Sequence, residues 1–170
     1  MSAQQTAHRA TPDFDRAGFI EAFGACFRGG TLIAGRAFDN AKTPLTDADS
    51  VSNALRDAFR AATDAERMDM LKAYTPLDPA VKAVEIVADE SQSSGLRAMT
   101  AGQQAKLLKL LSRYTEKFGF DVIFAVRKYT TASLIAAFEQ RIEDSYETEL
   151  QTTYAEVETL AEILVKAHFA

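Results

Sequence analysis

Apolar side chains recur every three or four residues along most of this chain, the spacing that places them on one face of an α-helix. Near the start, Phe19, Phe23 and Phe27 follow this spacing. Only 4 prolines and 8 glycines interrupt the 170 residues. We therefore expect an all-α fold, a single-domain bundle of about seven to eight helices. The expected helices cover residues 13–28, 49–62, 64–73, 79–88, 101–117, 131–143 and 146–167, with a short helical turn near 90–98.

Several residues mark where these helices begin and end. Thr63 with Glu66, and Thr100 with Gln103, have the spacing of a capping box, in which two side chains satisfy free N–H groups of the first turn. The pair Gly29-Gly30 is typical of a helix C-terminus. We expect it to end the first helix rather than to hold a phosphate.

One run does not fit a helix. Residues 118–126, Phe-Gly-Phe-Asp-Val-Ile-Phe-Ala-Val, are rich in β-branched and aromatic side chains. Since the chain has no second strand-like run to pair with, this run cannot build a sheet. We expect a buried, extended linker between two helices. Its backbone N–H and C=O groups then need partners, which are either side chains and water or a bound ligand.

The charge and the apolar pattern limit the classes of partner. The formal net charge is −5 and the pI about 5.1, whereas an electrostatic grip on nucleic acid needs a basic face. No apolar run approaches the roughly 20 residues of a membrane helix, and the first dozen residues lack the apolar region of a secretory signal. We expect a cytoplasmic protein without nucleic acid or membrane partners. It would have a disordered N-terminal tail over residues 1–12 and a helical domain over 13–170.

Few residues are suited to catalysis or metal binding. The single cysteine, Cys26, excludes an internal disulfide and a multi-cysteine zinc site, and is interpreted as a small buried hydrophobe on the first helix, with a nucleophile as the alternative. His8 and His168 lie almost at opposite ends of the chain, so we expect no metal. Most glutamates of the last two helices should lie on solvated faces or in helix ion pairs. They are Glu139, Glu143, Glu147, Glu149, Glu156, Glu158 and Glu162.

Several motifs resemble one protein family. Residues 114–120, Tyr-Thr-Glu-Lys-Phe-Gly-Phe, are similar to a motif of the OHCU decarboxylases (2-oxo-4-hydroxy-4-carboxy-5-ureidoimidazoline decarboxylases) of urate breakdown. In that family a tyrosine and three further residues precede Phe-Gly-Phe-Pro-Phe-Ile. The matched features span about residues 19–165, nearly the whole chain. In the same order as in the family, the others are residues 23–34, Gly95-Leu96 with Thr100, and Arg141-Ile142 with Asp144 and Glu149.

The resemblance implies an all-α fold, a homodimer, and a pocket between helices that works without a cofactor. It implies decarboxylation of a ureidoimidazoline carboxylate to S-allantoin. The family's catalytic pair is a histidine in a His-Pro motif and a glutamate in a Glu-Gln motif, and backbone groups after Phe-Gly-Phe hold the substrate ring.

This sequence matches the family's catalytic pair at only one of its two positions. Tyr74 stands where the family has its histidine, followed by Thr75 instead of proline; shifting the match by one residue would place Thr75 there. Glu90 matches the glutamate, five residues before Gly95. Glu90 is either a proton shuttle or a surface glutamate at a helix start. Tyr74 is either a hydrogen-bond donor to the substrate or a packed tyrosine, because a phenol with a pKa of about 10 is a poor proton shuttle near neutral pH.

Most polar groups of the family's pocket are replaced. Val87 takes the place of a serine, Ser91 that of the glutamine and Leu164 that of an arginine that would pair with a carboxylate. The ring-binding segment corresponds to Val122, Ile123, Phe124, Ala125 and Val126.

Three functions fit this pattern. The first is a cofactor-free decarboxylase acting on the family's substrate or on a less polar relative of it. The second is a small-molecule-binding or regulatory module that has kept the fold and lost the reaction. The third is a structural subunit that pairs with an active homologue.

Overall fold

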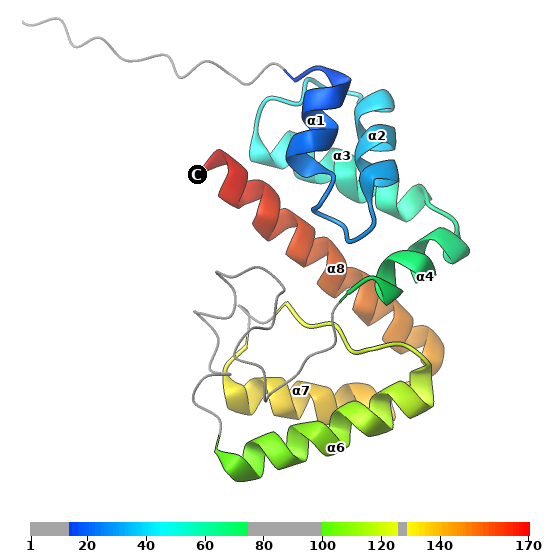
Figure 1. The fold of residues 1–170 in the computed structure, drawn as a ribbon, viewed down its shortest axis with the longest axis vertical. Helices are drawn as coiled ribbons and strands as arrows, with labels where there is room; N and C mark the ends of the chain where they lie inside the picture. Colours follow the sequence, from blue (N-terminus) through cyan, green and yellow to red (C-terminus); the bar gives the residue numbers. More distant parts are fainter. Residues whose placement is uncertain (1–13, 75–99, 126–128) are drawn as a thin grey trace, which may run out of the picture.

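The computed structural model describes residues 14–74, 100–125 and 129–170, and this part of the chain is all-α, as expected. It holds seven helices and no strand (Figure 1). No helix within these ranges is both long and apolar enough to cross a membrane. The helices are α1 (Arg16–Phe23), α2 (Thr31–Asp39), α3 (Ala48–Ala61), α4 (Asp64–Lys72), α6 (Ala101–Phe118), α7 (Thr131–Glu143) and α8 (Tyr146–Phe169).

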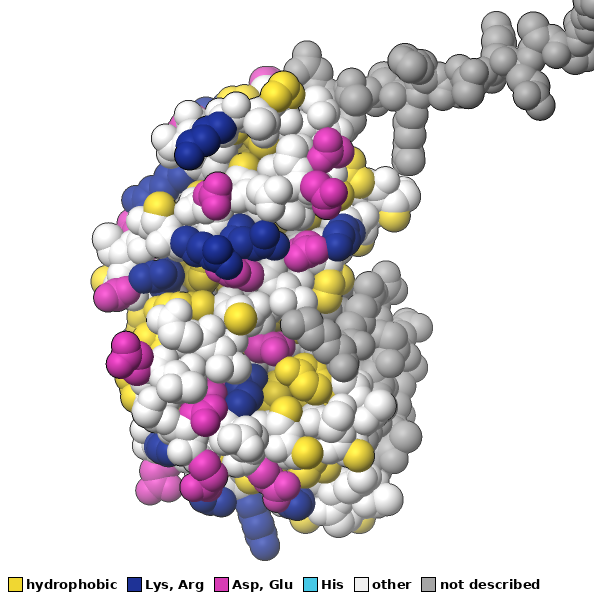
Figure 2. All heavy atoms as spheres, turned by 180° about the vertical axis from the view of Figure 1, so that it is seen from behind, with side chains coloured by type: hydrophobic (Ala, Val, Ile, Leu, Met, Phe, Trp, Pro, Cys, Tyr) yellow, Lys and Arg dark blue, Asp and Glu magenta, His cyan; other side chains and the backbone are white. Residues whose placement is uncertain are grey.

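The C-terminal helix α8 runs diagonally through the molecule and joins its two ends (Figure 1). The first three helices gather at one end, where α2 packs against α1 and α3, and α3 packs against α8. At the other end α6 and α7 lie side by side. The buried apolar residues of both ends form one continuous core. On the face seen in Figure 2, acidic and basic side chains are interspersed.

The expected helix over 13–28 is wrong at its C-terminal end. The helix ends at Phe23, and a further helix that the sequence reading missed, α2, begins at Thr31. Gly29 has a φ of +65°, which favours glycine, and Gly30 is the N-cap of α2. The glycine pair therefore starts a helix instead of ending one. The apolar spacing continued past Phe23 because the intervening turn also buries its side chains, including Cys26.

The capping boxes at Thr63 and Thr100 are both present, with Glu66 and Gln103 as the reciprocal side chains. Accordingly α4 and α6 begin where expected, and α3, α7 and α8 lie within about two residues of their expected bounds at most ends. The expected tail over 1–12, helix over 79–88 and turn near 90–98 lie outside the described residues.

The run that did not fit a helix follows α6. Gly119 caps that helix with a φ of +77°, and its N–H donates to the Thr115 carbonyl at 2.9 Å. We call residues 119–125 the linker segment. It has no helix or strand, it is stretched across the molecule towards the start of α7 (Figure 1), and Phe120 and residues 122–125 are buried. The expected buried extended linker is therefore found, starting one residue later than predicted.

Candidate ligand-binding site

Two buried side chains hold the backbone of the linker segment. Arg141 of α7 donates from Nη1 to the Ile123 carbonyl at 2.8 Å. Glu156 of α8 accepts, at Oε2, the N–H of Ala125 at 2.5 Å. Side chains of α7 and α8 thus provide partners that no helix or sheet supplies to this backbone.

Arg141 is itself fixed by a buried ion pair with Glu149. Its Nη2 lies 2.5 Å and its Nε 2.9 Å from Glu149 Oε1. The guanidinium carbon lies 4.5 Å from the centre of the Phe124 ring, which adds a cation–π contact to the linker segment. Burial lowers the pKa of Arg141, but its hydrogen bonds and charge attraction with Glu149 outweigh that effect and raise the pKa overall. Arg141 therefore remains a cation.

Tyr114 of α6 completes this cluster. Its hydroxyl donates to Glu149 Oε1, and the side chain is fully buried. Burial, followed by the hydrogen bond to Glu149, holds the pKa of Tyr114 well above its usual range, so the phenol stays a donor. The structure thus brings together Tyr114 of one family-like motif with Arg141 and Glu149 of another. Through Arg141, this cluster contacts Ile123 and Phe124 of the linker segment.

Glu156 also contacts Tyr129, which lies after the linker segment in the chain. Its Oε1 accepts a hydrogen bond from the Tyr129 hydroxyl at 2.9 Å. Burial, followed by the negative charge of Glu156, raises the pKa of Tyr129 to about 12. Tyr129 therefore donates across the physiological pH range.

Glu149 and Glu156 are exceptions to the expectation that most glutamates of the last two helices lie on solvated faces or in ion pairs. Both are buried, at 0% and 6% exposed, whereas Glu158 and Glu162 pair with arginines of α3 as expected. A signal was present in the sequence: Glu149, Thr153, Glu156 and Leu160 follow one another at helical spacing and share a buried face of α8.

Tyr74 follows the end of α4 and is buried. Its hydroxyl has no hydrogen-bond partner among the described residues. Burial raises its pKa well above the usual range, and the nearby Arg28 opposes the rise only in part. The groups acting on Tyr74 are Arg28 and Cys26, in the turn between α1 and α2. In the described part of the chain, no hydrogen bond or ring contact joins Tyr74 to the linker segment.

The remaining candidate residues divide into two groups. Residues 122–125 are buried in the linker segment, and Leu164 is partly buried on α8, where it packs against the core. Five others lie outside the described residues. They are Thr75, Val87, Glu90, Ser91 and Val126.

Cys26 is buried in the turn after α1, and burial raises the pKa of its thiol to about 11. Such a thiol is almost entirely protonated at neutral pH, which favours the buried hydrophobe over the nucleophile. The ranges that the structure describes contain no group of three or more histidine, cysteine or acidic side chains able to hold a metal.

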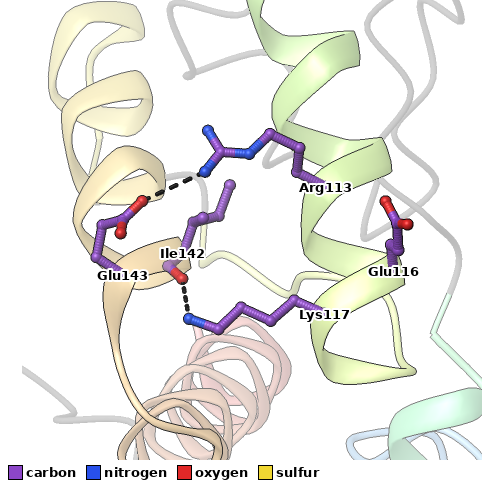
Figure 3. Close-up of a pocket in the computed structure, with 5 residues that line it drawn as sticks. All are labelled: Arg113, Glu116, Lys117, Ile142 and Glu143. Carbon is purple, nitrogen blue, oxygen red and sulfur yellow. Dashed lines mark hydrogen bonds and ion pairs between the residues drawn. The ribbon is translucent and has the colours of Figure 1, made fainter.

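A surface hollow of about 270 Å³ lies between α6 and α7 (Figure 3). Its two cations are engaged: Lys117 Nζ donates to the Ile142 carbonyl and, at 2.9 Å, to that of Asp144, while Arg113 lies 3.4 Å from Glu143. They bind the C-terminal end of α7, where helix carbonyls lack partners. This hollow therefore serves helix packing better than it serves an anionic ligand. It is lined by Arg113, Glu116, Lys117, Ile142 and Glu143.

The chain is similar to known proteins over nearly all of its length. Residues 12–163 match the family described as OHCU decarboxylase. A 2-oxo-4-hydroxy-4-carboxy-5-ureidoimidazoline decarboxylase of Haloferax volcanii is 27% identical over 152 residues, which cover 89% of each chain. A uric acid degradation bifunctional protein of Bacillus sp. (strain TB-90) is 26% identical over 84% of this chain and 28% of its own length.

Two solved structures share the fold. An OHCU decarboxylase crystallised in the presence of (S)-allantoin superposes with a TM-score of 0.67 at 18% identity, over 87% of this chain and 97% of its own. An (S)-allantoin synthase superposes with a TM-score of 0.71 at 16% identity, over 91% of this chain and 51% of its own. Because the family match extends over all seven described helices, from the start of α1 into α8, this chain belongs to the OHCU decarboxylase family.

Proposed function

We propose that this protein acts in uric acid degradation, where it binds a ureidoimidazoline-type carboxylate, or a less polar relative, on the linker segment and decarboxylates it slowly without a cofactor. The family membership supports the class of ligand. The observation that carries the proposal is the linker segment itself, a buried stretch of backbone anchored by Arg141 and Glu156. Backbone groups held in this way are already oriented before a ligand arrives.

The linker segment suits a reaction in which negative charge develops on a ring. When the carbon–carbon bond to the carboxylate breaks, carbon dioxide leaves and the electron pair remains on the ring as an enolate-like intermediate. Fixed N–H groups in a buried site stabilise such charge without reorganisation. A proton then adds to the carbanionic carbon and completes the product.

Proton transfer is the step for which this chain is poorly equipped. The burial of Tyr74 and its raised pKa support a packing role at this position and not the proton shuttle of the family's histidine. Proton transfer then falls to Glu90, which stands at the place of the family's glutamate. A positioned acid–base group typically contributes 10²–10⁴-fold, so we expect slow turnover.

A second function, ligand binding without turnover, is favoured by one observation. The only described candidate for acid–base work, Tyr74, is held protonated and makes no hydrogen bond within the described ranges. The protein would then serve as a binding or regulatory module, or as a structural subunit beside an active homologue.

Circular dichroism of newly formed allantoin separates the two functions. The unstable substrate is generated in situ from urate by upstream enzymes, and the Haloferax volcanii decarboxylase serves as the positive control. Slow, stereospecific turnover that Glu90→Ala abolishes would support the enzyme. If turnover stays at the uncatalysed rate while (S)-allantoin binds, the chain is a binding module. If neither occurs, the proposed ligand class is wrong.

We also propose that the protein is a homodimer, as the family resemblance implies, and that it acts in the cytoplasm, as expected from the sequence. Light scattering at micromolar concentration should give twice the 18.6 kDa of one chain. A mass equal to one chain would contradict the dimer.

A further inference from the structure

Glu156 is a buried carboxylate whose two oxygens are both in use. Oε2 accepts the Ala125 N–H at 2.5 Å, and Oε1 accepts the Tyr129 hydroxyl at 2.9 Å. The residue is only 6% exposed, on the buried face of α8. One side chain of the last helix therefore contacts the chain on both sides of residues 126–128.

Among the described residues, Glu156 makes no ion pair of its own, although its charge and that of Arg141 act on each other. Arg141, the buried cation of this region, is bound to Glu149 through Nε and Nη2. Within the ranges that the structure describes, the hydrogen bonds of Glu156 come from neutral donors. Burying a carboxylate that is not hydrogen-bonded to a cation is costly, and an apolar side chain at this place would avoid that cost. The role that explains a carboxylate at this position is its hydrogen bond with the Ala125 N–H.

The contacts of Arg141 and Glu156 define one edge of the linker segment. In an extended backbone the N–H and C=O groups of alternate residues point to the same edge, and those of the residue between them point to the opposite edge. The Ile123 carbonyl and the Ala125 N–H are the groups held by side chains. The N–H of Phe124 and the carbonyl of Val122 then belong to the other edge, and no hydrogen bond of the described residues ends on either.

We propose that Glu156 is a positioning residue, which fixes the Ala125 N–H and thereby turns the opposite edge, with the Phe124 N–H and the Val122 carbonyl, towards the ligand. This inference rests on the proposed function, because it names the groups of the linker segment that would meet the ligand ring. Tyr129 holds Oε1 and so keeps Oε2 directed at Ala125. Without the carboxylate, only Arg141 holds this edge, at the Ile123 carbonyl, and the backbone at Phe124 and Ala125 is free to turn.

The test compares three variants of the full chain with the unmodified protein. Glu156→Met keeps the length of the side chain and removes both acceptor oxygens. Glu156→Gln removes the charge and keeps one oxygen for Ala125. Glu158→Met is the matched control, because Glu158 lies two residues further along α8 and contacts Arg60 of α3. Two quantities are measured: the affinity for (S)-allantoin by calorimetry, and the amide exchange rates of residues 122–125 by NMR.

In the unmodified protein, the Ala125 amide should exchange slowly, and (S)-allantoin should shift the Phe124 amide more than that of Ala125. Glu156→Met should weaken (S)-allantoin binding on the order of tenfold, as expected for a buried hydrogen bond lost from a pre-oriented site. Glu156→Gln should restore most of that loss, and Glu158→Met should bind as the unmodified protein does. Rescue by glutamine would assign the effect to the hydrogen bond and not to the charge.

Two results overturn the inference while leaving the proposed function intact. One is unchanged (S)-allantoin affinity in Glu156→Met. The other is rapid exchange of the Ala125 amide in the unmodified protein, a measurement that needs no variant and so holds even if Glu156→Met does not fold. If the unmodified protein does not bind (S)-allantoin, the proposed function is overturned, and so is the part of the inference that concerns the ligand. Slow exchange of the Ala125 amide would still support its hydrogen bond with Glu156.

Discussion

Arg141 and Glu149 form an ion pair that is almost completely enclosed: the two side chains are 5% and 0% exposed, and Nη2 lies 2.5 Å from Oε1. The pair joins the last turn of α7 to the first turn of α8. Because Arg141 also binds the Ile123 carbonyl, the same guanidinium connects two helices and the linker segment.

Removing one partner of this pair should be strongly destabilising. Arg141→Met leaves Glu149 buried without a cation, and we expect the free energy of unfolding to fall by about 3–5 kcal/mol. Urea denaturation followed by circular dichroism measures the change. Arg113→Met is the control, because Arg113 is exposed and lies 3.4 Å from Glu143, and exposed pairs contribute about 0–1 kcal/mol. Equal losses in the two variants would contradict the assignment.

Tyr74→Phe should not destabilise the protein. The hydroxyl of Tyr74 is buried and no described group meets hydrogen-bond geometry with it; the Arg28 backbone is its nearest polar influence, so removing the hydroxyl gives up at most a poor contact. We expect the free energy of unfolding to stay level or to rise by up to about 1 kcal/mol. The change in the free energy of unfolding can be measured by thermal and by urea denaturation of the two proteins. A loss beyond about 1 kcal/mol would show that the hydroxyl has a partner.

Tyr74→His alone should restore little decarboxylation. The pocket changes at Val87, Ser91 and Leu164 would remain, and catalytic groups that act as a unit are not additive. The rate of allantoin formation, compared with that of the unmodified protein at equal concentration, tests this expectation. A gain approaching the 10²–10⁴-fold typical of a positioned acid–base group would mean that the missing histidine is the main defect.

The Arg36–Glu66 pair should make stability depend on pH in the acid range. Hydrogen bonds from Arg36, followed by that from the Thr63 N–H, lower the pKa of Glu66 from 4.5 to about 2. A carboxyl whose pKa is lower in the folded than in the unfolded state contributes stability above the unfolded value, and loses it as the pH falls towards the folded value. The contribution of Glu66 should thus disappear between about pH 4.5 and about pH 2.

Urea midpoints recorded at intervals across that range test the Glu66 prediction. Glu66→Gln should show a shallower fall with decreasing pH than the unmodified protein, since it has no carboxyl to protonate at this position. Parallel pH profiles for the two proteins would exclude the assigned role of Glu66.

The helices that the sequence predicted well are those with explicit start signals. Thr63 with Glu66 and Thr100 with Gln103 fix their helices by local hydrogen bonds, which need no knowledge of the rest of the fold. The region around Gly24 and Gly29 was predicted wrongly because Phe27 is buried from a turn, at a spacing that also suits a helix. Apolar residues at helical spacing indicate which side chains are buried, and a buried side chain in a turn can continue that spacing by one position.

The site could be predicted only in part. The linker segment was recognised because β-branched and aromatic residues follow one another in it without the spacing of a helix face, next to a glycine. Its partners, Glu149 and Glu156, were hidden among the many glutamates of the last two helices. Which of them are buried depends on the face of α8 that meets the linker segment, and that is decided by tertiary packing.

Helix α8, 24 residues and about 36 Å long, carries two kinds of contact within three residues: Glu156 holds Ala125, and Glu158 pairs with Arg60 of α3. Nearby residues of α8 therefore face two different parts of the molecule, the linker segment and α3. The linker segment and the helices nearest the N-terminus therefore share one support, although they lie far apart in the chain. A chain that ended before Glu156 would lose both contacts together, so the linker segment and the first helices depend on the same stretch of α8.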